Sequence, residues 1–216
     1  MKNWSRKRKL ILCVVILLIS LIFITSISEC PSPTLQIAIH RAEKQMLIGP
    51  SEVVDILDFT FSNWDHLVLG ETKYGYITYE YQDGLGWDNG HLRYFEKTPV
   101  ATVFTTDYPY RTDNDQWLPI IAFPENAKSV SARLMLSSSG IESSKDIQLE
   151  GHKSDTDYFL FSLPTDALDT ELYWLIQQAI SGSWQEYVLT GTVEIQIDFY
   201  DRSGNLVDTY SKTVTR

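Results

Sequence analysis

An apolar stretch near the start of the chain limits its possible folds more than any other part of the sequence. Leu10 to Ile27 reads LILCVVILLISLIFITSI, 18 residues without a charged side chain. As a helix it would be about 27 Å long, close to the ~30 Å hydrocarbon core of a bilayer. A helix also satisfies its own backbone hydrogen bonds in lipid. The stretch therefore predicts a single transmembrane helix at residues 10–28.

The charges on either side of this stretch predict its orientation. Five of the 18 basic residues precede it, and all 28 acidic residues follow it. Because positive charge marks the cytoplasmic end of a membrane helix, residues 1–9 are expected to form a short basic cytoplasmic tail. The rest of the chain would then lie outside the cytoplasm of a bacterial cell. After Lys9 the formal charge is −15, which disfavours binding to nucleic-acid phosphates.

Cys30 leaves three ways in which the membrane could hold this protein. Ile27, Ser28 and Cys30 resemble the motif at which bacterial lipoproteins are cut and lipidated, but Glu29 occupies a position that should be small. A cleaved signal peptide would have a shorter apolar region. An uncleaved signal anchor needs only length and flanking charge, so we favour it and regard lipidation of Cys30 as a weaker alternative. Cys13 is about 25 Å of helix away, too far for a disulfide with Cys30.

A short amphipathic helix is expected next, from residue 34 to residue 47, within a linker region covering residues 29–50. Ser32 would cap it, and a Gly-Pro pair at 49–50 would end it. Polar residues, Glu43 among them, mainly occupy one side. The apolar side consists of Leu35, Ile39, Ala42 and Met46.

From Phe59 onward the apolar pattern has a period of two, which is typical of β-strands. The sequence lacks the alternation of strands and helices that would indicate a parallel sheet. We therefore expect a mainly β fold with flanking helices, in which residues 51–216 form an antiparallel, sandwich-like domain. A subdivision of this domain near residue 125 is an alternative.

Two later segments have clear patterns. Helical spacing returns after Thr165, with Leu168, Leu172, Leu175, Ala179 and Ile180 on one face. A final hairpin would turn at Asp201 to Asn205. Its first strand would bury Val193, Ile195, Ile197 and Phe199.

Catalytic and metal-binding motifs are absent from the sequence. His66 and His91 would form a metal site only if two strands brought them together, and Asp113 and Asp115 lack the continuation of a calcium loop. No nucleophile elbow or phosphate-binding loop occurs. A glycosidase would need two acids at a set separation. The acids around the expected turn are Glu80, Asp83, Asp88 and Glu96.

Aromatic residues near turns are the strongest candidates for contact with a ligand, although packing of these rings over the bases of loops is the favoured interpretation. Trp87 lies in a glycine-rich turn, GLGWDNG, and three further rings border the polar loop before Leu118. Aromatic faces beside polar groups bind sugar rings and also serve protein interfaces. The candidate ligand-facing aromatics are Trp87, Tyr108, Tyr110 and Trp117.

Together these patterns predict a non-enzymatic, single-pass membrane protein with an extracytoplasmic β-rich domain and no cofactor. Its role would be binding or structural support at the cell envelope, with an envelope protein or a glycan as partner. Two alternatives stay open. The domain could be a carbohydrate-binding module that uses the four aromatics, or an envelope hydrolase with acids near Asp83 to Asp88.

Overall fold

The computed structural model describes residues 6–27, 32, 34–58, 60–61, 66–81, 90–106, 109–112, 115–140, 144–181 and 191–215. The side chains of residues 23–27, 60–61, 110–112, 115 and 181 lie outside this description. The predicted Trp87, Tyr108 and Cys30, with Asp83 and Asp88, also lie outside it.

The first helix, α1 (Arg6–Ile27), has 22 residues and contains the whole apolar stretch. Most large apolar side chains from Leu10 to Ile22 are exposed, Leu10 by 68% and Ile22 by 63%. No helix among the residues that the structure describes combines the length and the apolar character of a membrane span. The helical form of the stretch is confirmed, and the membrane anchor stays a prediction.

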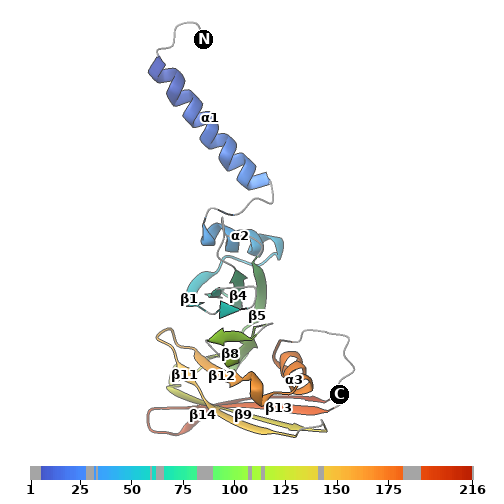
Figure 1. The fold of residues 1–216 in the computed structure, drawn as a ribbon. Coiled ribbons are helices and arrows are strands. Elements are labelled where there is room, and N and C mark those ends of the chain that lie inside the picture. Colours follow the sequence, from blue (N-terminus) through green and yellow to red (C-terminus); the bar gives the residue numbers. More distant parts are fainter. Residues whose placement is uncertain are drawn as a thin grey trace.

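Strands dominate the rest of the chain and form three antiparallel sheets (Figure 1). Sheet B has the order β1-β3-β4-β5, and sheet D has the order β10-β9-β13-β14. Sheet C has the order β11-β12-β8-β7-β2, with β6 also paired to β8. The bounds are β1 (Glu52–Asp58), β2 (Thr60–Phe61), β3 (His66–Glu71), β4 (Gly75–Tyr81), β5 (His91–Glu96), β6 (Ala101–Thr105), β7 (Tyr110–Thr112), β8 (Asp115–Pro124), β9 (Ser131–Ser139), β10 (Asp146–Glu150), β11 (His152–Lys153), β12 (Phe159–Pro164), β13 (Thr192–Tyr200) and β14 (Leu206–Thr215).

The three sheets stack as layers, with sheet C in the middle (Figure 1). Tyr76 of sheet B stacks on Phe123 of sheet C at 4.1 Å between ring centroids. On the other side of sheet C, Phe159 lies 5.8 Å from Phe199 of sheet D. The mainly antiparallel β prediction is confirmed, but three sheets replace the two of a simple sandwich.

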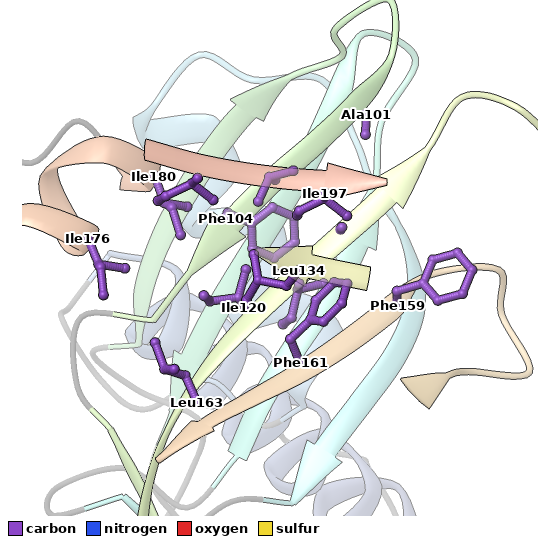
Figure 2. Close-up of a cluster of buried hydrophobic side chains, with 14 of the residues drawn as sticks. Ala101, Phe104, Ile120, Leu134, Phe159, Phe161, Leu163, Ile176, Ile180 and Ile197 are labelled. Atoms are coloured by element: carbon purple, nitrogen blue, oxygen red, sulfur yellow. The ribbon is translucent and has the colours of Figure 1, made fainter. Parts of the chain in front are cut away.

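One hydrophobic cluster joins all three sheets and continues past residue 125 (Figure 2). Its residues before that point include Phe104 and Ile120, and those after it include Leu134 and Ile197, all of them fully buried. In addition, β12 pairs with β8 along six positions, which links the two parts of the chain by backbone hydrogen bonds. The division into domains itself stays a prediction.

The helix α2 (Leu35–Gln45) covers the face of sheet B that points away from sheet C. Its buried apolar residues, Ala38 and Ile39, pack with Ile77 and Tyr79 of that sheet. The predicted helix is confirmed, but two details were wrong. Thr34 caps it in place of Ser32, because the Thr34 side chain accepts a hydrogen bond from Ile37 N at 3.3 Å.

The second wrong detail concerns two single positions of α2, since Leu35, Ile39 and Ala42 pack against sheet B as predicted. Met46 is 48% exposed, whereas Glu43 is 2% exposed. The Glu43 carboxylate accepts hydrogen bonds from Ser51 N at 2.8 Å and from the Ser51 hydroxyl. It also lies 2.8 Å from His40 Nδ1. These partners compensate for the loss of hydration, so a carboxylate occupies a position that the apolar pattern assigned to the solvent side.

The last helix, α3 (Thr170–Ser181), follows the 3-10 helix η1 (Thr165–Ala167) and packs on β13, β14 and β6. Leu172, Leu175 and Ala179 are fully buried, as predicted. In the final hairpin, Asp201 Oδ1 accepts hydrogen bonds from the backbone of Ser203 and Asn205, which fixes the predicted turn. Val193, Ile195, Ile197 and Phe199 are all fully buried, as predicted.

Candidate functional site

Two of the four aromatic residues predicted to face a ligand lie among the described residues, and the structure brings these two together. Tyr110 of β7 pairs directly with Trp117 of β8, so the two residues belong to one face of sheet C. Trp117 is half-buried and packs against the main core cluster. Trp87 and Tyr108 lie outside the described residues, so the predicted aromatic site stays a prediction.

The two described acids around the turn do not form the carboxylate pair that a glycosidase would need. Glu80 pairs with His91, whereas Glu96 pairs with Gly75 at the other end of the same two strands. Five strand positions separate the two pairs, which corresponds to about 17 Å. Glycosidase acids are ~5–9.5 Å apart, so Glu80 and Glu96 do not form such a pair.

The two histidines considered for a metal site lie on opposite faces of sheet B. His66 pairs with Tyr81, and His91 pairs with the neighbouring Glu80, whose side chain points the other way. His66 Nδ1 lies 2.7 Å from Asp58 Oδ1. Within the described part of the chain, no group of three His, Cys, Asp or Glu residues is arranged to hold a metal ion.

A polar group inside the molecule connects α3 to the sheets. Gln177 is 1% exposed, and its Nε2 donates a hydrogen bond of 2.6 Å to the carbonyl of Thr106. Arg93 donates to the neighbouring carbonyl of Thr105 at 3.3 Å. Because the side chains of Thr105 and Gln177 are buried, this group positions α3 and offers no surface to a ligand.

On the outer face of sheet D, several polar side chains are connected to one another by hydrogen bonds. We call this face the distal polar face, because sheets B and C and the helix α2 all lie on the other side of sheet D (Figure 1). Its residues are those that alternate with the core positions of the four strands. They are Asp146, Gln148, Glu150, Arg133, Met135, Ser137, Glu194, Gln196, Asp198, Tyr200, Thr209, Ser211 and Thr213.

Asp198 lies at the centre of this face and is only 8% exposed. Its Oδ1 accepts hydrogen bonds from Thr209 Oγ1 at 2.8 Å and from Gln196 Nε2 at 2.9 Å. Its Oδ2 accepts from the Tyr200 hydroxyl at 3.4 Å. One carboxylate therefore holds three neighbouring side chains in fixed positions.

A row of four paired residues crosses the distal polar face at Asp198. Arg133 pairs with Asp198 on one side and with Glu150 on the other, while Thr209 continues the row on β14. Arg133 Nε donates to Glu150 Oε1 at 2.8 Å, and this hydrogen bond raises the pKa of Arg133 above its ordinary value. The guanidinium also lies over the Tyr200 ring, 5.9 Å from its centroid.

The distal polar face can bind a ligand mainly through hydrogen bonds. Hydroxyl, amide and carboxylate groups dominate it, and its acids, Asp146, Glu150, Glu194 and Asp198, outnumber the single cation Arg133. Sequence reasoning identified the inward residues of β9 and β13 but did not assign a role to the outward ones. The signal was present, since Glu194, Gln196, Asp198 and Tyr200 alternate with the core residues of β13.

Comparisons with protein-family models, curated proteins and solved structures find no match for this chain.

Proposed function

We propose that this protein is a non-enzymatic, single-pass membrane protein whose extracytoplasmic β-rich domain binds a neutral polysaccharide of the cell envelope. The distal polar face is the binding surface. The protein would hold the polysaccharide near the membrane without changing it.

The membrane anchor is supported by the sequence of α1. Eighteen uncharged residues follow a cluster of basic residues, which suits a signal anchor with a cytoplasmic N-terminus. The exposure of its apolar side chains also fits, because a helix that is apolar on all sides is normally surrounded by protein or lipid. The acidic remainder would then lie on the outer side.

The observation that carries the binding proposal is the layered arrangement of the sheets. The helix α2 covers one side of sheet B, and sheet C lies between sheets B and D. Only the outer face of sheet D remains as a broad sheet surface among the described residues. This face also lies opposite to α2, the element that follows the proposed anchor, so it would point away from the membrane.

The chemistry of the distal polar face favours a neutral polysaccharide. Sugar hydroxyls both donate and accept hydrogen bonds, and the amide of Gln196 and the hydroxyl of Thr209 can do the same. Asp198 already holds these groups in place, which reduces the entropy that binding would otherwise cost. The excess of carboxylates disfavours anionic polymers by repulsion.

A binding experiment with the full chain in lipid nanodiscs tests this proposal. Neutral and anionic envelope polysaccharides would be compared as ligands, and the variant Gln196→Ala would be compared with Gln36→Ala, an exposed glutamine on α2. We expect binding to a neutral polysaccharide that weakens about tenfold in Gln196→Ala, as for the loss of one or two hydrogen bonds. Gln36→Ala should bind as the wild type does.

Four outcomes would contradict the proposal. Failure to bind any neutral polysaccharide would remove its basis, as would equal binding by both variants. Loss of binding in Trp87→Ala but not in Gln196→Ala would favour the aromatic residues predicted from the sequence. Cleavage of a polysaccharide by the protein would contradict its non-enzymatic role and favour an envelope hydrolase.

A further inference from the structure

The last strand of the chain forms the longest open sheet edge in the described structure. β14 has 10 residues and pairs with β13 along one side only, at the end of sheet D. The other edge strands are shorter: β6 and β10 have five residues each, β5 has six, and β2 and β11 have two each. β1, with seven, has a register irregularity between Val53 and Asp55.

An edge of this kind can pair with another strand. Its free backbone N–H and C=O groups form a template for one more strand, and β14 contains no proline that would prevent pairing. Charged residues on an edge normally discourage such pairing. The arrangement of the charges on β14 therefore decides which strand fits.

The charges of β14 are complementary to those of a second β14. If two copies pair in antiparallel fashion with Tyr210 opposite Tyr210 of the second copy, each Asp208 faces a Lys212 and each Lys212 faces an Asp208. In the described part of the chain, neither Asp208 nor Lys212 forms an ion pair of its own. Opposite charges directly across a strand pair stabilise it, whereas like charges destabilise it.

We propose that two copies of this protein form a homodimer by antiparallel pairing of their β14 strands, centred on Tyr210. The dimer is isologous, since the same surface serves both copies. It joins the two four-stranded D sheets into one continuous eight-stranded sheet. Two distal polar faces then become one surface, which provides two-site binding of a long polymer.

The orientation of the layers is compatible with this pairing in one membrane. The twofold axis of an antiparallel strand pair is normal to the sheet, and that normal runs from sheet D through sheet C toward α2 (Figure 1). Both copies of α2 therefore lie on the same side of the joined sheet. Two chains anchored in one membrane require this arrangement. This point rests on the proposed anchor, and the two-site binding of a polymer rests on the proposed function, whereas the edge and its charge pattern depend on neither.

Charge reversal in the full chain tests the dimer. Sedimentation in detergent would measure the dissociation constant for the wild type, Asp208→Lys, Lys212→Asp and the double variant Asp208→Lys/Lys212→Asp. Each single variant places like charges opposite each other twice, so we expect dimerisation about tenfold or more weaker. The double variant restores both pairs with their signs exchanged and should dimerise within about threefold of the wild type.

The proposal fails if the wild type stays monomeric at all concentrations tested. It also fails if the single variants dimerise as well as the wild type, or if the double variant is no better than either single variant. Thermal melting of all four proteins shows whether each variant is folded. The result is independent of polysaccharide binding, because no ligand is present.

Discussion

The Tyr158 hydroxyl donates a hydrogen bond of 2.7 Å to Asp55 Oδ2 and so joins residues that are 103 positions apart in the chain. Tyr158 immediately precedes β12 of sheet C, and Asp55 lies in β1 of sheet B. Burial and the hydrogen bond to Asp55 both raise the pKa of Tyr158 above its ordinary value. This contact connects the edge strand of sheet B to the middle layer.

Replacement of Tyr158 by phenylalanine should destabilise the protein by about 1–2 kcal/mol, because the hydrogen bond to a charged acceptor is lost while the ring stays in place. Urea denaturation at pH 7 measures this change. In an Asp55→Asn background the same replacement should cost clearly less. An equal cost in both backgrounds would show that the contact contributes nothing specific.

The buried carboxylate of Glu43 should hold α2 against the start of β1. Glu43→Gln keeps the shape of the side chain but replaces a carboxylate by a neutral amide. The carboxylate accepts hydrogen bonds from Ser51 and lies next to His40. We expect a loss of about 2 kcal/mol and faster amide hydrogen exchange in α2. Lys44→Gln, an exposed neighbour, is the control and should change neither quantity. Unchanged exchange in Glu43→Gln would contradict this role.

Ile197 should be essential to the core that the sheets share. It is fully buried and pairs with Leu134 in sheet D (Figure 2). Ile197→Ala should lower the free energy of unfolding by about 2–5 kcal/mol. Ser211→Ala, on the exposed face, should change it by less than about 0.5 kcal/mol. Because one cluster spans both sides of residue 125, unfolding of the β-rich part should remain a single transition. Two separate transitions, only one of them shifted, would indicate two domains.

Tyr76 should make the protein sensitive to alkaline pH. Burial, with smaller effects from Glu71 and Glu125, raises the pKa of Tyr76 to about 12. The unfolded chain releases this proton near pH 10, so the stability that the protonated ring contributes is present below pH 10 and is lost as the pH rises toward 12. The free energy of unfolding should therefore fall over this range.

Tyr76→Phe removes this titration but keeps a ring to stack on Phe123. Its free energy of unfolding should fall less between pH 10 and pH 12 than that of the wild type. Tyr74→Phe, which replaces an exposed ring, is the matched control and should follow the wild type. Identical pH profiles for Tyr76→Phe and the wild type would contradict the assignment.

Strand patterns in the sequence predicted much of the fold because alternation reports directly on one buried face. Ala132, Leu134 and Leu136 of β9 are buried as their spacing indicates, and so are the inward residues of β13. The third sheet was not predicted. β8 contains the continuous apolar run Leu118 to Phe123, which is buried on both faces because sheet C lies between two other sheets. A run of this kind does not indicate how many layers surround it.

The candidate site was harder to predict than the fold. Asp198 has the sequence context of an ordinary outward residue between Ile197 and Phe199. Its role as a shared acceptor depends in part on Thr209 of the next strand, and its place beside Arg133 depends on pairing with a strand 65 positions earlier. Such contacts follow from register, which a single sequence does not fix. Glu43 shows the same limit, since its burial depends on Ser51 beyond the end of the helix.

In the proposed topology, the acidic, β-rich part of this protein lies outside the cytoplasm while α1 stays in the membrane. A single cysteine at Ser211 on the distal polar face, in a background with Cys13 and Cys30 replaced by serine, tests it directly. A membrane-impermeant maleimide should label Ser211→Cys in intact cells, or in spheroplasts where an outer membrane is present. A cysteine at Ser5 in the basic tail should react only after lysis. Labelling of Ser211→Cys only after lysis would contradict the topology, and with it the proposed binding at the cell envelope.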